Sequence, residues 1–236
     1  MRHRPAVIVS LSLNVSLIIL LFAGFFTPPL PAYAGESEWT AEATPGRLDN
    51  TLAPTDMDIR DMAIGDDAMT LYAAPGDSIA DTVIYKSADT GVSWATIPVS
   101  ARADFVAVAP DDKNLVVIAN SSTHEVFLSL NGGTSWDSLG VPTGATSISD
   151  LDISEPRENK YYIAVAGTDT TGGNLWYLGY GHGAPIWQET RTFSGLAPST
   201  DAINALAFSP DFAADSTIAT VTDAIGTGVQ LQLLNV

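Results

Sequence analysis

Cysteine is absent from the sequence, and basic residues are scarce. The 236 residues contain ten Lys and Arg against 27 Asp and Glu, which gives a net charge of −17. Without cysteine there is no disulfide framework, no thiolate metal site and no cysteine nucleophile. The shortage of Lys and Arg argues against nucleic-acid binding, because phosphate neutralisation needs clustered basic side chains. A hydrophobic content of 46% excludes wholesale disorder, so we expect an acidic folded protein.

The N-terminal residues 1–34 have the pattern of a secretory signal peptide. A basic start is followed by an apolar core at residues 17–26, and Ala32-Tyr33-Ala34 has the small-x-small form of a cleavage site. An uncleaved membrane anchor is the alternative, because residues 6–26 are long enough to cross a bilayer. In either case we expect residues 35–236 to be secreted or displayed at the cell surface.

An internal repeat sets the architecture. Residues 82–94 align without gaps to residues 124–136, and the tryptophans that end the two segments lie 42 residues apart. Both segments contain Ser-x-(Asp/Asn)-x-Gly-x-Ser-Trp. The residues of this pattern are Ser87, Asp89, Gly91, Ser93 and Trp94 in the first copy, and Ser129, Asn131, Gly133, Ser135 and Trp136 in the second.

The pattern predicts a β-hairpin with a specialised turn. The Asp or Asn side chain is expected to bind nearby backbone N–H groups, and the glycine supplies a positive φ. Each tryptophan should begin the returning strand and bury its ring. If both rings lie in the core, Trp94→Ala and Trp136→Ala should each cost about 3–5 kcal/mol. A much smaller cost would indicate exposed rings, such as platforms for sugar stacking.

Short apolar-x-apolar segments indicate further copies of the repeat. They begin at Met62, Val106, Leu151 and Leu206, which are spaced 44, 45 and 55 residues apart. Four short strands in each unit of about 45 residues are typical of a propeller blade. We therefore predict an all-β fold, a β-propeller with about four four-stranded antiparallel blades. The predicted units are residues 56–98, 99–141, 146–191 and 201–236.

The last two units and the N-terminal segment depart from this scheme. The third unit is degenerate and keeps only Trp187 as its returning tryptophan, and the fourth ends after three predicted strands. Residues 37–44, with Trp39, resemble an outer strand that has no blade before it. Two hypotheses stay open: a complete four-bladed ring closed by that strand, or the front of a larger propeller.

The two turn segments resemble the Asp-box, or bacterial neuraminidase repeat. The first copy matches every defining position, and the second has Asn131 in place of Asp. Asp-box propellers include sialidases, xyloglucan-cleaving glycoside hydrolases, sortilin-type receptors and a photosystem assembly factor. In those families the box is a turn on the blade rim and has no catalytic part. The resemblance therefore implies sortilin- or sialidase-like blades, in a complete or truncated member, and says little about chemistry.

Catalytic sets are missing. A sialidase needs three arginines on a substrate carboxylate, but the segment after residue 34 has five in all and lacks the expected Arg-Ile-Pro sequence. A glycoside hydrolase could use two carboxylates across a cleft. The candidate carboxylates are Asp56, Asp58, Asp61, Asp104, Asp150 and Asp152. We interpret each as a turn cap or a surface charge, and we assign no catalytic residue.

No cofactor is predicted, although one acidic stretch could bind Ca²⁺, which takes six to eight oxygen ligands. Its members are Asp56, Asp58, Asp61, Asp66 and Asp67. They do not form an Asp-x-Asp-x-Asp-Gly loop, so we assign no metal site.

The sequence thus favours an exported, non-enzymatic β-propeller that serves as a binding or structural module of the cell surface or envelope. Its expected partner is a carbohydrate or an envelope protein, with membrane contact only through an uncleaved N-terminal segment. The alternative is a fragment of an extracellular glycoside hydrolase.

Overall fold

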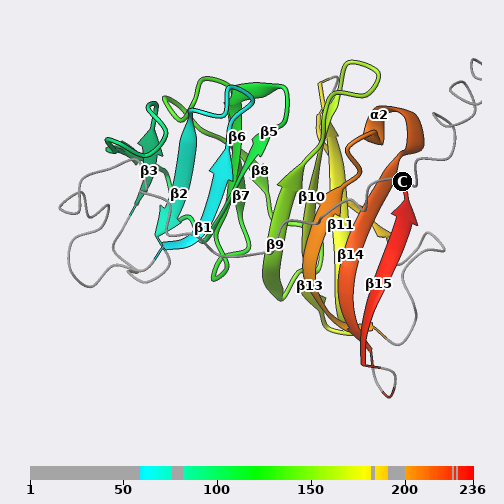
Figure 1. Cartoon of the computed structure of the whole chain (residues 1–236). Helices are drawn as coiled ribbons and strands as arrows, with labels where there is room; N and C mark the ends of the chain where they lie inside the picture. The colour runs from blue at the N-terminus through cyan, green and yellow to red at the C-terminus, as the bar shows by residue number, and fades with distance from the viewer. Residues whose placement is uncertain (1–58, 76–81, 182–183, 191–199, 225, 227) are drawn as a thin grey trace, which may run out of the picture. The chain divides into compact units, whose positions relative to one another are not determined.

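The computed structural model describes residues 59–75, 82–181, 184–190, 200–224, 226 and 228–236 (Figure 1). The chain divides into two units, 1–43 and 44–236, and all described residues belong to the second. The predicted signal peptide, the outer strand with Trp39, and Asp56 and Asp58 lie outside the described residues. Among the described residues, none forms a helix long and apolar enough to cross a membrane.

Strands that follow one another in the chain pair antiparallel to form separate sheets, which we call sheets I to IV. Sheet I contains β1 (Ile59–Ile64), β2 (Leu71–Pro75), β3 (Val83–Ser87) and β4 (Ala95–Pro98). Sheet II contains β5 (Phe105–Ala109), β6 (Asp112–Ala119), β7 (Val126–Ser129) and β8 (Asp137–Gly140).

Sheet III contains β9 (Ser147–Ile153), β10 (Tyr161–Asp169), β11 (Gly172–Tyr180) and β12 (Gln188–Glu189). Sheet IV has three strands, β13 (Thr200–Phe208), β14 (Thr217–Ala224) and β15 (Gly228–Asn235). The short helix α2 (Phe212–Asp215) lies in the connection between β13 and β14.

The sheets pack face to face through apolar clusters. One cluster joins sheets I and II around Ile84 and Ile118, and a second joins sheets II and III around Val117 and Ile163. A third joins sheets III and IV and is centred on Phe212. Strands covered on both faces read as continuous apolar runs, and all five residues of β5 are buried. Consecutive antiparallel sheets stacked in this way are propeller blades, so the predicted fold class is confirmed.

The turn between β3 and β4 is held by side-chain hydrogen bonds. The buried Ser87 Oγ donates to Asp89 Oδ1 at 2.8 Å and accepts from the backbone N–H of Gly91 at 2.8 Å. Asp89 also accepts from the backbone N–H of Ser93 at 2.8 Å and from its hydroxyl at 2.6 Å. Gly91 has a φ of 85°, a conformation that glycine adopts without steric cost.

The turn between β7 and β8 repeats this arrangement without the charge. Ser129 Oγ donates to Asn131 Oδ1 at 3.0 Å and accepts from Gly133 N–H at 2.8 Å. The backbone N–H of Ser135 donates to Asn131 Oδ1 at 2.9 Å, and Asn131 Nδ2 donates to Ser135 Oγ at 2.8 Å. An amide can therefore replace the carboxylate, because the hydroxyl of Ser135 here accepts instead of donating.

The burial of the two tryptophan rings, expected from the repeat, is partial. Trp94 and Trp136 are half-buried, because each stands beside an outermost strand, β4 or β8, in which most residues are exposed or half-exposed. Trp94 Nε1 donates to Gly91 O of its own turn at 3.1 Å. Trp136 packs instead against the cluster between sheets I and II. Trp187 is also half-buried, and its Nε1 donates to Leu139 O of the preceding sheet at 3.0 Å.

We therefore expect the two tryptophans to contribute unequally to stability. Trp136→Ala should lower the free energy of unfolding by about 2–3 kcal/mol, because it uncovers a cluster shared by two sheets. Trp94→Ala should cost about 1 kcal/mol, since it removes one hydrogen bond and contacts within a turn. Urea unfolding of both variants measures the difference. Equal losses, or a larger loss for Trp94→Ala, would contradict this account.

Candidate functional site

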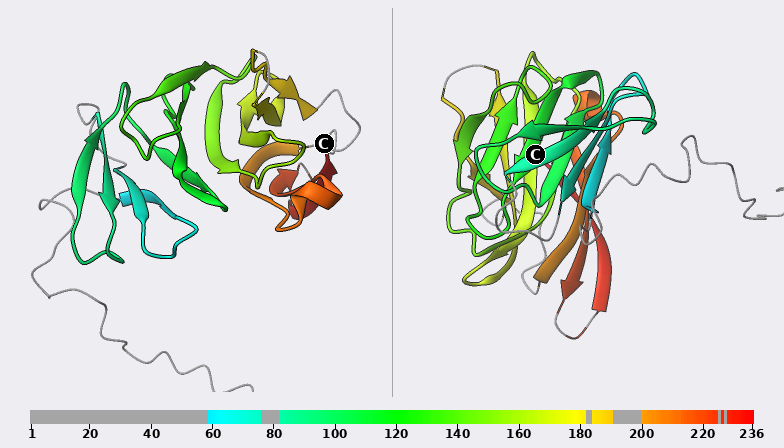
Figure 2. Two further views of the ribbon diagram at one scale, coloured as in Figure 1. Left: turned by 90° about the horizontal axis from the view of Figure 1, so that it is seen from above. Right: turned by 90° about the vertical axis from the view of Figure 1, so that its left-hand side faces the viewer.

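The first strands of the four sheets are neighbours in space. β1 lies beside β5, β5 beside β9, and β9 beside β13. Figure 2 shows these sheets following one another in chain order. Strands of different sheets do not share a hydrogen-bonded ladder, so their inner backbone N–H groups need other acceptors.

Carboxylates supply those acceptors. Asp61 Oδ2 on β1 accepts from the backbone N–H of Val106 on β5 at 2.8 Å. Two carboxylates of β9 do the same for β13. Asp150 Oδ2 accepts from Leu206 N–H at 2.7 Å, and Asp152 Oδ2 accepts from Phe208 N–H at 2.9 Å. The other oxygen of each carboxylate accepts from the N–H of the next residue in its own strand, at 2.8–2.9 Å.

The interpretation of these residues as turn caps or surface charges is therefore wrong. Asp61, Asp150 and Asp152 lie within strands, are only partly exposed, and join one sheet to the next. An apolar side chain at any of these positions would leave a backbone N–H of the neighbouring strand without this acceptor.

The interpretation of Asp104 as a turn cap or a surface charge is also wrong, because this residue is fully buried. Its Oδ1 binds Arg102 and, at 3.2 Å, Nη1 of Arg60 from β1. Its Oδ2 accepts from the backbone N–H and the hydroxyl of Ser121 at 2.7 and 2.8 Å. The guanidinium of Arg60 lies 4.8 Å from the centre of the Phe105 ring. Asp104 is thus the buried centre of an ion cluster that connects the start of β5 to β1.

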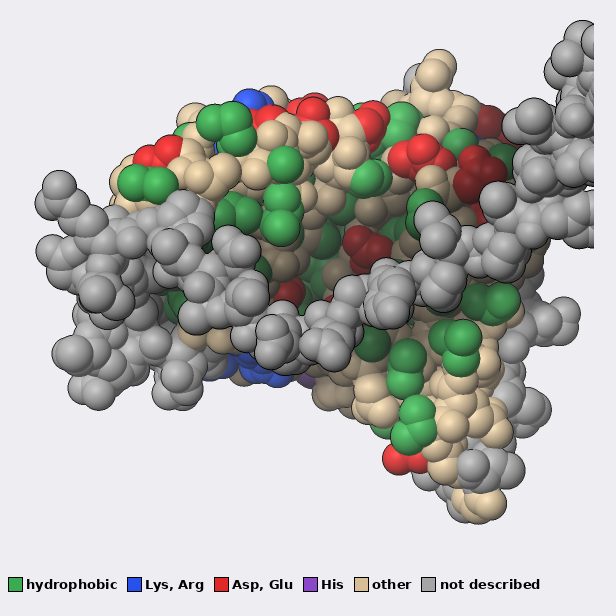
Figure 3. Space-filling view, in the orientation of Figure 1, with side chains coloured by type: hydrophobic (Ala, Val, Ile, Leu, Met, Phe, Trp, Pro, Cys, Tyr) green, Lys and Arg blue, Asp and Glu red, His purple; other side chains and the backbone are tan. Residues whose placement is uncertain are grey.

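A cavity of about 350 Å³ opens beside Asp152, among the first strands of sheets II, III and IV. We call it the inner cavity. It is lined by Val108, Pro110, Asp152, Ile153, Ser154, Glu155, Phe208, Ser209 and Pro210. Figure 3 shows acidic side chains recessed in the hollow of this face. The walls are mostly apolar, with carboxylates of Asp152 and Glu155 as the charged groups.

The electrostatics of the inner cavity are set mainly by burial. Burial raises the pKa of Asp152 to about 6, although hydrogen bonds from Phe208 and Ile153 oppose the shift. The other charges that act on Asp152 are the carboxylates of Asp150 and Asp61, which raise its pKa further. Burial also raises the pKa of Asp150 and Asp61. At neutral pH Asp152 is thus a poorly solvated anion beside an apolar wall.

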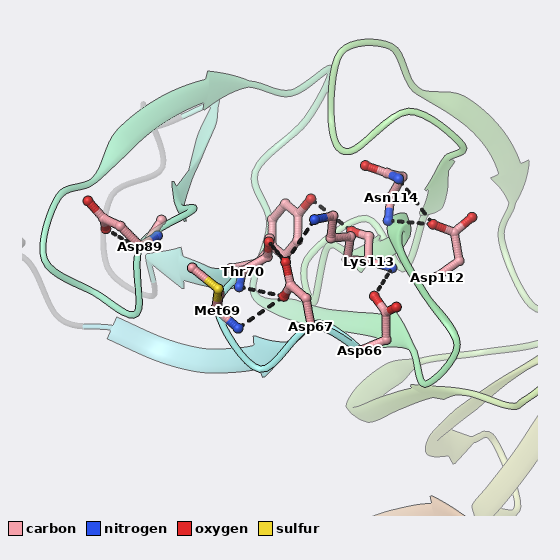
Figure 4. Close-up of polar contacts among 10 residues, drawn as sticks. Asp66, Asp67, Met69, Thr70, Asp89, Asp112, Lys113 and Asn114 are labelled. Carbon is pink, nitrogen blue, oxygen red and sulfur yellow. Dashed lines mark hydrogen bonds and ion pairs between the residues drawn. The ribbon is translucent and has the colours of Figure 1, made fainter.

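The acidic residues Asp66 and Asp67, considered for Ca²⁺, lie elsewhere, in the turn between β1 and β2 (Figure 4). Asp67 Oδ2 binds Lys113 Nζ at 2.8 Å, and Asp66 Oδ1 accepts from the Lys113 backbone N–H at 2.9 Å. The Lys113 ammonium and the backbone N–H groups of Met69 and Thr70 hold the pKa of Asp67 far below its usual range. Within the described part of the chain, no three His, Asp or Glu side chains gather in a way that could hold a metal ion.

Sequence reasoning missed the inner cavity and the bridging carboxylates. A signal was present in β9, because Asp150 and Asp152 interrupt a strand that otherwise carries small or apolar residues. A carboxylate in a strand covered on both faces needs hydrogen-bond donors from a neighbour. Which neighbour supplies them depends on how the sheets stack, and that is not visible in one repeat.

Comparisons with known proteins do not assign this chain to a family. No family profile and no curated protein match the sequence. Among solved structures, a structure described as YCF48 bound to D1 peptide is 13% identical, with a TM-score of 0.46 over 78% of this chain. A functionally unknown protein from Desulfotomaculum acetoxidans is 16% identical, with a TM-score of 0.48 over 75% of this chain. The chain spans 57% and 55% of the lengths of these two proteins.

The raised pKa of Asp152 predicts how stability depends on pH. A carboxyl that binds its proton more tightly in the folded state contributes stability that is complete below its unfolded pKa, near 3.8. This contribution is lost as the pH rises through about 6. We expect the midpoint of thermal unfolding to fall between pH 4.5 and 7.5, and to fall less in Asp152→Asn.

Asp137→Asn is the matched control, because Asp137 is an exposed carboxylate on β8. It removes one negative charge, as Asp152→Asn does, so it corrects for general repulsion in this acidic protein. A wild-type midpoint that is flat or rises over this range would contradict the assignment. A slope unchanged in Asp152→Asn would contradict it as well.

Proposed function

We propose that this protein is an exported, non-enzymatic β-propeller that binds another protein of the cell surface or envelope. The inner cavity carries the proposal, because it places a buried carboxylate beside an apolar wall. Export is inferred from the signal-like pattern of residues 1–34 and is tested by locating the protein in cell fractions.

The chemistry of the inner cavity favours a basic side chain of a peptide segment. The methylenes of Lys or Arg would pack against Val108 and Phe208, and the cationic end would reach the carboxylate of Asp152. A volume of about 350 Å³ suits one or two side chains. The net charge of −17 would also speed the approach of a basic partner.

A carbohydrate is the less favoured ligand for the inner cavity. Sugars are usually bound by open aromatic surfaces together with several free polar groups. Among the described residues that line the cavity, Phe208 is the one aromatic, and it makes an edge-to-face contact with Phe212, with ring centres 4.7 Å apart.

The binding proposal predicts a preference for cationic peptides. Fluorescence anisotropy with labelled peptides centred on Arg or Lys should show saturable binding, whereas matched peptides centred on Glu should not bind. Asp152→Asn should weaken binding about tenfold, which corresponds to about 1.4 kcal/mol. Glu155 also lines the cavity, so Glu155→Gln should weaken peptide binding as well, but by a smaller factor. The Gln side chain can still accept the hydrogen bond from the Ala213 N–H.

Asp137→Asn is again the control and should bind as the wild type does. Equal binding of basic and acidic peptides would refute the role of the carboxylates, and so would binding that neither cavity variant weakens. Circular dichroism and thermal unfolding of each variant separate loss of binding from loss of folding.

The second candidate function is an extracellular glycoside hydrolase fragment. It is favoured by one observation, the pKa of about 6 for Asp152, which is in the range of a general acid. Incubation with polysaccharides and measurement of reducing ends tests it. Sugar release that Asp152→Asn abolishes and Asp137→Asn preserves would replace the binding proposal.

A further inference from the structure

Sheet IV ends in a long edge strand. In sheets I to III the outermost strands β4, β8 and β12 have four, four and two residues. The strand β15 has eight residues, and its register with β14 runs without a bulge. In the described part of the chain no strand lies beyond β15, which Figure 1 shows at the outer edge of its sheet.

The strand β15 also lacks the features that protect edge strands from pairing. Such strands usually carry charged side chains, proline or a bulge. The sequence of β15, Gly-Val-Gln-Leu-Gln-Leu-Leu-Asn, contains neither a charged residue nor proline. By contrast, β4 ends in Pro98, and the pairing of β8 with β7 is irregular between Val126 and Phe127. The edge of β15 can therefore accept a further strand.

One hydrogen bond fixes which backbone groups of β15 face this edge. The backbone N–H of Val236 donates to Ser216 O at 2.9 Å, so Val236 points its backbone groups toward β14. In an antiparallel sheet the backbone groups of successive residues point alternately to the two sides of the strand. The residues whose N–H and C=O groups point to the free edge are therefore 229, 231, 233 and 235.

This alternation matches itself in one antiparallel register. If Leu231 of one copy lies opposite Leu233 of a second copy, Val229 lies opposite Asn235, and Gln232 meets Gln232 of the second copy on a two-fold axis. All four outward residues of each strand then form hydrogen-bonded pairs, with about eight hydrogen bonds in total. A shift by one residue opposes outward residues with inward ones and forms none of these bonds.

The side chains and charges also suit this register. Val229, Leu231 and Leu233 are 71%, 71% and 66% exposed, on one face of β15. Each Leu231 would lie next to Leu233 of the other copy, and apolar cross-strand pairs stabilise a sheet. Because the net charge is −17, two copies repel each other over most of their surfaces, and an uncharged strand is where they can approach.

We propose that β15 pairs antiparallel with β15 of a second copy of this chain, so that the two copies of sheet IV become one continuous sheet. The contact is isologous, since the same strand contributes from both copies, and it therefore closes at a dimer. It satisfies the outward backbone groups of β15. It leaves the inner cavity, on the first strands of sheets II to IV, as a separate surface.

The absence of cysteine allows a direct test of the register. In the proposed dimer the two Gln232 residues form a non-hydrogen-bonded pair, with Cα atoms about 4.5 Å apart, which is within the range of a disulfide. Full-length Gln232→Cys should therefore form a disulfide-linked dimer on air oxidation. Gln230→Cys is the matched control, because the register places residue 230 opposite Leu234 and far from residue 230 of the other copy.

Sedimentation velocity of the full-length protein tests association without a cross-link. We expect a monomer–dimer equilibrium that strengthens with ionic strength, because salt screens the repulsion between two acidic copies. Leu231→Pro should weaken the dimer at least tenfold, because it removes an outward N–H and leaves the ladder with β14 intact. Leu231→Thr loses the same side chain but keeps the N–H, so it should weaken the dimer by a smaller factor. Circular dichroism checks the folding of each variant.

Three outcomes would overturn the proposal. The first is a wild type that stays monomeric at every concentration and ionic strength. The second is equal cross-linking of Gln232→Cys and Gln230→Cys, since the strands would then not be held in the two-fold register. The third is association that Leu231→Pro leaves unchanged, which would place the contact elsewhere, for example in the apolar residues 17–26.

Discussion

The junctions between sheets I and II and between sheets III and IV depend on carboxylates that accept hydrogen bonds from the backbone of the next sheet. Side-chain packing between sheets is apolar and has little directional preference, so it fixes their separation better than their register. The bonds from Val106 to Asp61 and from Leu206 to Asp150 fix that register at single N–H groups. Their cost is the partial burial of an anion, which appears as a raised pKa for each carboxyl.

The same requirement creates the proposed binding surface. Asp152 must lie on the inner side of β9 to reach the Phe208 N–H, and there it also lines the inner cavity. A cationic ligand would favour the ionised form of this carboxyl, which burial disfavours. Binding and proton release are therefore coupled, and the affinity of a basic peptide should rise as the pH passes the pKa of Asp152.

The repeat predicted much of the fold, because strand order and turn chemistry are local. The unit predicted at residues 99–141, for example, contains strands β5 to β8, which lie between residues 105 and 140. How far the rings of Trp94 and Trp136 are buried could not be predicted from the repeat, because it depends on which strand is outermost. The roles of Asp104 and Asp152 were missed for a similar reason, since their donors lie on residues 17 and 56 positions away. One copy of a repeat carries no information about what its neighbour presents.

The turn that contains Asn131 has a consequence for chemical ageing. An Asn-Gly pair usually deamidates readily, because the glycine nitrogen can attack the side-chain amide. Here the Gly132 N–H donates to Asn114 O at 2.8 Å, Gly132 is buried, and the Asn131 amide is bound at both ends. The folded turn thus shields a labile bond, and conversion of Asn131 to Asp would record how often this hairpin opens.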